Sequence, residues 1–164
     1  MDTRPTTDRI KETLFNMLNP YIPGAVFIDL YSGSGGIGIE ALSRGAMHAY
    51  FVENNKNAIA CIMENLKHTK FTERATVLKQ DVLSALYGVR EREADVIFMD
   101  PPYDRDYEKE VLRVLNSVPY VTERTLIVVE ASLKCDFSYL EQMGFILTKD
   151  KRYKTNKHIF CHKA

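Results

Sequence analysis

The chain has 164 residues, with 22 basic and 22 acidic side chains, and 45% of its residues are hydrophobic. This length and composition suit one globular domain over residues 1–164, and the zero net charge excludes the overall basic character of many nucleic-acid-binding proteins. No apolar run approaches the length of a membrane span, and the N-terminus lacks the apolar stretch of a signal peptide. The three cysteines lie far apart and match neither a disulfide framework nor a zinc site. We therefore expect a reduced, cytoplasmic protein without a bound metal.

The first twenty residues predict a helix. Apolar residues between Ile10 and Leu18 recur at helical spacing and would form one buried face. Thr7 or Asp8 is a suitable N-cap, because either side chain can accept a hydrogen bond from a free N–H group of the first turn. Pro20 is expected to end the helix, because proline interrupts helical hydrogen bonding.

Downstream of this helix, short apolar runs alternate with helical patterns. Buried strands are predicted at 25–30, 48–53, 75–80, 94–99 and 126–131, and helices at 37–44, 55–67 and 107–118. Strands separated by helices form parallel units with right-handed crossovers, and continuous apolar runs suit a sheet that is covered on both faces. The last two segments, 145–153 and 158–163, predict an antiparallel hairpin. The sequence therefore predicts an α/β fold: a doubly wound, Rossmann-like, mostly parallel sheet with a C-terminal hairpin.

A glycine-rich stretch follows the first predicted strand. Gly33, Gly35 and Gly38 fit the pattern G-x-G-x-x-G between a strand and a helix. The first two glycines let the backbone turn tightly and approach a ligand, and the third lets the helix pack close to the strand. A plain glycine turn would explain the motif by itself. Its position favours a nucleotide-binding loop, because ligands of doubly wound sheets bind beyond the carboxyl ends of the strands.

Acidic residues at the strand ends discriminate between nucleotides. Glu53 ends the second strand, 20 residues after Gly33, where it can accept hydrogen bonds from the ribose hydroxyls of NAD or of S-adenosylmethionine. Asp29 precedes the glycine loop and would sit poorly beside a pyrophosphate, but it suits the ammonium or sulfonium charge of S-adenosylmethionine. Asp81, which is followed by Val82, can accept from the adenine amino group, cap the next helix, or do both.

The fourth predicted strand ends in the corner Asp100, Pro101, Pro102 and Tyr103. The exocyclic amine of a base is a weak nucleophile, because its lone pair is delocalised into the ring. The Asp100 carboxylate and the Pro101 carbonyl can accept its two N–H groups, and the fixed φ angles of the prolines keep this grip rigid. Tyr103 offers a flat face for base stacking. The alternative is a simple turn, because turns also favour aspartate and proline.

The glycine loop followed by this corner resembles the S-adenosylmethionine-dependent amino-methyltransferases. The segments RPTTDRIKETLFNML (Arg4 to Leu18), DLYSGSGGIGIEALSRGA and DPPY more closely resemble the bacterial small-subunit ribosomal RNA guanine-N2 methyltransferase family. That resemblance implies a seven-stranded fold and methyl transfer from S-adenosylmethionine to the exocyclic N2 of a guanine. It also implies a pocket lined by Thr7, Asp29, the glycine loop, Glu53, Asp81 and Asp100.

The same resemblance implies ribosomal RNA or a small-subunit particle as the partner. Members of the family carry a short basic segment ahead of the region that matches here from Arg4, and we expect that segment to be absent from this chain. RNA phosphates would then be held by Arg4, Arg9 and the basic stretch Lys149 to Lys157. We expect a monomer that does not bind membranes.

Other functions fit parts of the pattern. Amino-methylation of adenine in DNA or RNA, or of a protein side-chain amide, would use the same corner. A corner that begins with asparagine is typical of the protein-glutamine enzymes, so Asp100 disfavours that class. A nicotinamide-binding Rossmann protein would explain the glycine loop and Glu53, but not the segment 100–103. A cofactor-binding module without activity would explain the loop alone.

Overall fold

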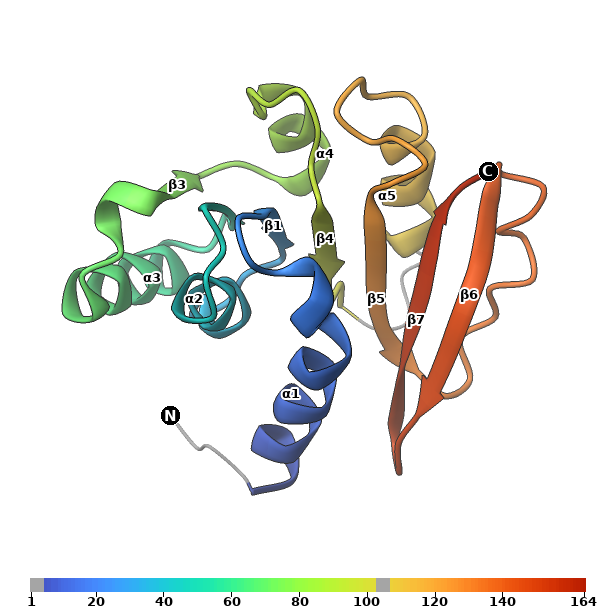
Figure 1. Ribbon diagram of the computed structural model, residues 1–164, viewed down its shortest axis with the longest axis horizontal. Coiled ribbons are helices and arrows are strands. Elements are labelled where there is room, and N and C mark those ends of the chain that lie inside the picture. Colours follow the sequence, from blue (N-terminus) through green and yellow to red (C-terminus); the bar gives the residue numbers. More distant parts are fainter. Residues whose placement is uncertain (1–4, 103–106) are drawn as a thin grey trace.

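The computed structural model describes residues 5–102 and 107–164, and it contains one seven-stranded sheet (Figure 1). The order of the strands across the sheet is β3-β2-β1-β4-β5-β7-β6. The strands are β1 (Val26–Leu30), β2 (His48–Val52), β3 (Ala75–Leu78), β4 (Val96–Met99), β5 (Leu126–Ser132), β6 (Phe145–Arg152) and β7 (Asn156–Lys163). Strands β1 to β5 run parallel to one another, and β7 is antiparallel to both of its neighbours, β5 and β6. The predicted fold class, including the C-terminal hairpin, is confirmed.

Helices cover both faces of the sheet. They are α1 (Pro5–Leu18), α2 (Gly36–Ser43), α3 (Lys56–Thr69), α4 (Val82–Ala85) and α5 (Tyr107–Leu115), with 3-10 turns η1 (Asn19–Tyr21), η2 (Thr72–Arg74) and η3 (Leu86–Gly88). Side chains of α1, α2 and α3 pack on the face that carries Phe27, Phe51 and Phe98. Those of α4 and α5 pack on the other face, against Ile28 and Ile97. Alternate residues of each central strand are thus buried on opposite faces, as the continuous apolar runs predicted.

The beginning of α1 differs from the expectation. The helix starts at Pro5, so Thr7 and Asp8 lie within its first turn and neither is the N-cap. Proline is well tolerated at the start of a helix because its missing N–H would have no partner there. The carboxylate of Asp8 in the first turn still interacts favourably with the positive end of the helix dipole.

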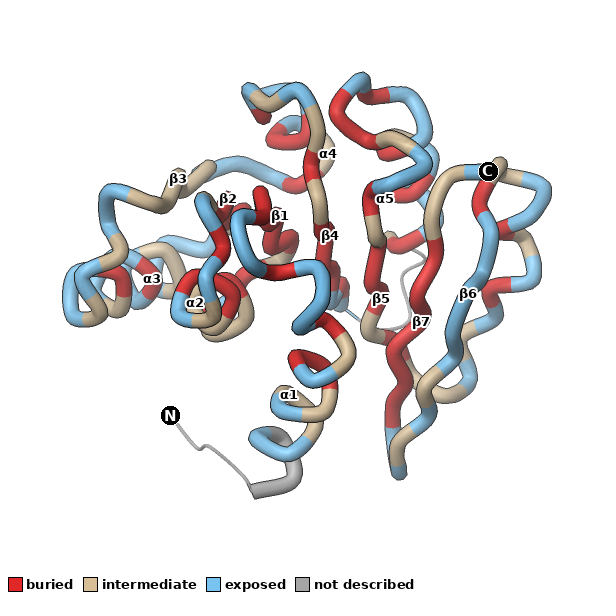
Figure 2. The backbone as a smooth tube through the Cα atoms, viewed as in Figure 1, coloured by how far each residue is buried: buried red, intermediate tan, exposed pale blue. Residues whose placement is uncertain are grey.

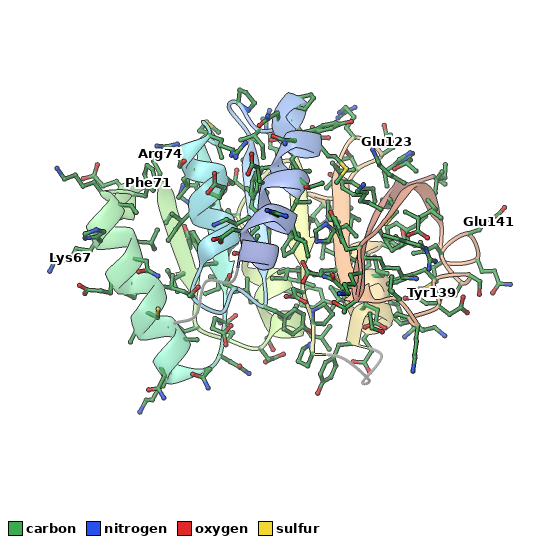
Figure 3. All side chains as sticks on the ribbon, turned by 90° about the horizontal axis from the view of Figure 1, so that it is seen from below. Lys67, Phe71, Arg74, Glu123, Tyr139 and Glu141 are labelled. Carbon is green, nitrogen blue, oxygen red and sulfur yellow. The ribbon has the colours of Figure 1, made fainter. Side chains whose placement is uncertain are left out.

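Side chains after α3 connect this helix to α2. The guanidinium of Arg74 lies 5.1 Å from the centre of the Phe71 ring, and the two side chains lie together in Figure 3. The same guanidinium donates to the carbonyl of Leu42 at 3.0 Å and to that of Ala46. These contacts fix the start of β3, which is the edge strand on this side of the sheet.

The hairpin brings its turn to the carboxyl end of the parallel strands. In the β5–β7 register, Ser132 at the end of β5 lies opposite Asn156 at the start of β7. The turn at 153–155 therefore lies just beyond the carboxyl end of β5, at the same end of the sheet as the beginning of α1 (Figure 1). Within the hairpin, β7 is mostly buried and β6 is the exposed edge (Figure 2). No helix among the described residues is long and apolar enough to cross a bilayer.

Candidate cofactor and catalytic site

A cavity of about 750 Å³ opens at the carboxyl ends of the parallel strands, where doubly wound sheets bind their ligands. This volume is within the range of small-molecule sites. Among the residues predicted from the sequence, the cavity is lined by Gly33, Glu53, Asp81, Val82, Asp100, Pro101 and Pro102. The fold therefore brings the ends of β1, β2 and β4 and the beginning of α4 around one space.

The glycine loop has the backbone geometry that its sequence predicted. Gly33 and Gly35 have φ angles of 58° and 85°, in the left-handed region that favours glycine. Gly35 is also the N-cap of α2. At Gly38, an added Cβ would collide with the ring of Phe51, so this glycine allows α2 to pack closely against β2. Of the three glycines, Gly33 lines the cavity, while Gly35 and Gly38 support the loop from behind.

Asp29 lies beneath the loop and is only 1% exposed. Its Oδ2 accepts a hydrogen bond from the N–H of Gly38 at 3.0 Å, and the Ser32 hydroxyl donates to its main-chain carbonyl at 2.6 Å. Burial raises the pKa of Asp29 to about 7, even though the hydrogen bond from Gly38 acts in the opposite direction. Asp29 is not among the residues that line the cavity, so it shapes the loop and contributes its charge from below.

Glu53 connects the loop to the end of β2. Its Oε1 accepts from the N–H of Gly33 at 2.9 Å, and its Oε2 accepts from the N–H of Asn55 at 3.1 Å. A carboxylate can accept about four hydrogen bonds, so Glu53 retains capacity for two ligand hydroxyls. Because it also lines the cavity, the predicted ribose-binding position is available to it.

Asp81 combines the two placements that its sequence position allowed. It is the N-cap of α4, with its carboxylate accepting from the N–H of Ser84 at 3.2 Å, and it lines the cavity as well. The hydrogen bond from Ser84 lowers the pKa of Asp81, so this group is ionised at neutral pH. The adjoining Val82 and Leu83 give the same wall of the cavity an apolar surface.

Two tyrosines in the cavity wall were not predicted from the sequence. The rings of Tyr31 and Tyr107 stack with centroids 6.4 Å apart and planes inclined by 23°, and both line the cavity. Tyr31 also has a φ angle of 60°, which is rare for a residue with a side chain and concentrates at functional sites. Tyr31 directly follows β1 and precedes Gly33, and this position in the sequence could have indicated that it belongs to the site.

The corner at the end of β4 places Asp100, Pro101 and Pro102 in the cavity wall. The Asp100 residue is open to the cavity, but its carboxyl group points towards Glu130 of β5. Removal of the carboxyl from water, together with the negative charges of Glu130 and Asp29, raises the pKa of Asp100 well above the ordinary range. Tyr103 lies outside the described residues, and so does the side chain of Thr7.

Behind Asp100 lie three polar side chains that the sequence did not predict for the site: Glu130, His158 and Tyr153. Glu130 Oε1 lies 2.7 Å from Nε2 of His158, and His158 Nδ1 lies 2.9 Å from the hydroxyl of Tyr153. His158 is 1% exposed, and its ring lies edge-on to Phe98 at 6.1 Å. Glu130 is an acid within the apolar run LIVVEA, which forms the strand next to β4, and this unusual placement could have indicated a role in the site.

The basic stretch Lys149 to Lys157, which was predicted to hold RNA phosphates, contains one lysine that is buried. Lys157 is only 4% exposed, and its ammonium donates to the carbonyl of Cys135 at 2.7 Å, so it is not available to a phosphate. Lys149, Arg152 and Lys154 are exposed, as is Arg9 on α1. Arg4 lies outside the described residues.

A family model, curated relatives and solved structures each match most of the chain. The family model described as conserved hypothetical protein 95 matches residues 1–162. YlbH of Bacillus subtilis, provisionally named an rRNA methyltransferase, is 39% identical over 92% of this chain and 83% of its own length. The ribosomal RNA small subunit methyltransferase D of Haemophilus influenzae is 38% identical over 77% of this chain and 67% of its own. The solved structure of yhhF from Escherichia coli, provisionally named a methyltransferase, has a TM-score of 0.83, with 30% identity over 98% of this chain and 87% of that one.

Proposed function

Because the chain belongs to the family of ribosomal RNA small subunit methyltransferase D, we propose that it methylates the exocyclic N2 amine of a guanine in small-subunit ribosomal RNA, with S-adenosylmethionine as the methyl donor. The observation that carries this proposal is the charge of the cavity. Four acidic side chains, those of Glu53, Asp81, Asp100 and Glu110, line it, and no lysine or arginine of the described segments does. Such a lining suits a cationic cofactor.

The same charge pattern disfavours the nicotinamide alternative. The pyrophosphate of NAD would place two negative charges among these carboxylates, and their repulsion would oppose binding. S-adenosylmethionine carries a sulfonium and an ammonium and no phosphate, so its charges are complementary to the lining. Glu53 would accept from the ribose hydroxyls, and Val82 with Leu83 would pack against the adenine.

The corner at the end of β4 would hold the target amine. Bound S-adenosylmethionine supplies a methyl group on a positively charged sulfur, which leaves as a neutral thioether. The protein must then orient the amine, and Asp100 and the carbonyl of Pro101 provide two hydrogen-bond acceptors at the mouth of the cavity. Neither Pro101 nor Pro102 has an N–H group, so this backbone offers acceptors to a donor-rich amine. Guanine N2 has two N–H donors and fits this arrangement.

RNA would approach the carboxyl end of the sheet. A base that is paired or stacked in RNA must leave its stack to reach a cavity at the strand ends. Exposed basic side chains lie towards this end: Arg9 on α1, and Arg152 and Lys154 at the turn of the hairpin, with Lys149 further along β6. They would contribute salt-sensitive phosphate contacts that do not depend on sequence.

Methyl transfer to small ribosomal subunits tests the proposal. The subunits are prepared from cells that lack methyltransferase D, and they are incubated with the protein and methyl-labelled S-adenosylmethionine. Mass spectrometry of the nucleosides should find N2-methylguanosine, and Asp100→Asn should form far less of it in the same time. Detection of N6-methyladenosine instead would show that the target base is adenine and not guanine. Binding of NAD and not of S-adenosylmethionine in calorimetry would overturn the cofactor assignment.

A further inference from the structure

The register of the sheet places two carboxylic acids side by side at the target end of the cavity. In the parallel pairing of β4 with β5, Met99 lies opposite Val129, so the next residues, Asp100 and Glu130, stand at the same level. Alternation along β4 directs Asp100 to the face that carries Phe98, and His158 lies against Phe98 on that face. Asp100, Glu130 and His158 are therefore brought together by the strand pairing.

We propose that Glu130, held by His158, is a positioning residue that makes Asp100 the base for the proton released by the methylated amine. This inference rests on the proposed function. Glu130 has a 20% exposed side chain that faces the corner, whereas His158 is 1% exposed and fills the space behind it. The hydroxyl of Tyr153, 2.9 Å from Nδ1, fixes the imidazole from its far side. The acid next to Asp100 therefore has a defined orientation.

The chemistry requires one proton acceptor in each turnover. The lone pair of the amine forms the new nitrogen–carbon bond, and the carbon–sulfur bond breaks with its electron pair remaining on sulfur. The nitrogen then carries a positive charge, which is lost when one of its N–H protons moves to the Asp100 carboxylate. Asp100 opens to the cavity, so this proton passes to water when the product leaves. Glu130 keeps its own bonding partners throughout and changes only the proton affinity of Asp100.

The charged groups around Asp100 support this role. Glu130 of β5 and Asp29 of β1 face it with negative charge, and both raise its pKa. From the other walls, Glu53, Asp81 and Glu110 also contribute acids to the cavity. A cationic donor in the cavity would favour the ionised Asp100 before transfer. Loss of the sulfonium charge on transfer would then raise the proton affinity of Asp100 at the step that releases the proton.

A purely structural ion pair is the competing explanation for the Glu130–His158 contact. Such a pair would affect stability but would not change how the rate of methyl transfer depends on pH. Glu130→Gln distinguishes the two, because the substitution preserves size and hydrogen bonding but removes the charge next to Asp100. His158→Gln should retain a donor near the position of Nε2 and behave like the wild type, whereas His158→Leu removes it. Matched controls are Glu91→Gln and His48→Gln, whose partners are Tyr50 at 2.7 Å and Thr76 at 2.8 Å.

The experiment combines two measurements on the full chain. Carboxyl carbon NMR, with the Asp100 resonance assigned by Asp100→Asn, follows the titration of Asp100 directly. Single-turnover methyl transfer to small subunits as a function of pH follows its role in the reaction. In Glu130→Gln we expect Asp100 to titrate at lower pH and the acidic limb of the rate profile to move with it. The plateau rate should fall by about tenfold, because a weaker base takes the proton. The affinity for S-adenosylmethionine should not change.

His158→Leu should shift the Asp100 titration and the pH–rate profile in the same direction as Glu130→Gln does. His158→Gln should leave both close to those of the wild type. An unchanged Asp100 titration in Glu130→Gln would overturn the inference, and so would a changed titration with an unchanged rate profile. If the wild-type protein transfers no methyl group to the subunits, the proposed function fails instead. The NMR titration needs no RNA, and it would still show whether Glu130 controls Asp100.

Discussion

The N–H of Gly33 donates to Oε1 of Glu53 at 2.9 Å, and this single bond joins the glycine loop after β1 to the end of β2. Two residues that the sequence placed 20 positions apart thus form one edge of the cavity. The carboxylate that would bind the ribose also sets the position of the loop beneath it. Substitution of Glu53 should therefore affect the ligand and the loop together.

We expect Glu53→Ala to weaken binding of S-adenosylmethionine by about 1 to 3 kcal/mol, the scale of losing charge-assisted hydrogen bonds. Isothermal titration calorimetry measures this change directly. Glu64→Ala, at an exposed position on α3, is the matched control and should bind like the wild type. Equal affinity of Glu53→Ala and the control would remove Glu53 from the cofactor site.

Gly38→Ala should destabilise the protein by about 1 to 3 kcal/mol, the usual cost of overpacking a well-packed site. The added methyl group would collide with the ring of Phe51, which is fully buried beneath α2. Gly36→Ala is a suitable control, because its nearest neighbour would be the Ser34 hydroxyl oxygen at 3.9 Å and its φ angle is not positive. Urea unfolding compares the two, and equal midpoints would contradict the close packing of α2 on β2.

The buried carboxyl of Asp29 should make stability depend on pH. Its folded-state pKa is raised from 3.8 to about 7, so folding favours the protonated form. The free energy of unfolding should therefore fall as the pH rises from about 4 to 7, as Asp29 becomes ionised in both states. Asp29→Asn removes this contribution, and its stability should vary less with pH over that window. Urea titrations of both proteins at several pH values measure the difference, and parallel curves would argue against the raised pKa.

Asp100→Asn should lower the rate of methyl transfer by about 10² to 10⁴, the usual contribution of a positioned proton acceptor. The amide keeps one acceptor oxygen but adds N–H donors that oppose those of the target amine. Cofactor affinity should change little, because the main partner of Asp100 is the amine. Single-turnover rates and calorimetry separate the two effects. Near-normal turnover would show that the corner is only a structural turn.

Lysines of the hairpin should fall into two classes. Lys154→Ala should weaken binding to small subunits without loss of stability. Because one phosphate contact is lost, the slope of log affinity against log salt concentration should become shallower by about 1. Lys157→Ala should instead lower the midpoint of thermal unfolding, because its buried ammonium donates to the Cys135 carbonyl and lies 5.4 Å from the centre of the Phe137 ring. Binding assays at several salt concentrations and thermal melts test this division. A loss of stability in Lys154→Ala would contradict it.

The amino-acid sequence by itself determined the alternation of strands and helices, the glycine loop and the corner at the end of β4. These features are local: apolar periodicity, backbone freedom at Gly33 and Gly35, and the fixed φ angles of Pro101 and Pro102 act within a few residues. The general rule for doubly wound sheets then placed the cavity at the carboxyl ends of the strands. The first turn of α1 was predicted less well, because Thr7 and Asp8 both had the chemistry of an N-cap.

Only the tertiary structure decided which distant groups meet at the site. The hairpin register places His158 opposite Glu130, and the β4–β5 register places Glu130 beside Asp100. A shift of one residue in either pairing would direct these side chains to the opposite face, and no local pattern specifies that choice. The same register buries Lys157, although it belongs to the basic stretch Lys149 to Lys157 that was expected to hold RNA phosphates. Strand pairing thus determines which ionisable groups lose contact with water, and that loss sets their chemistry.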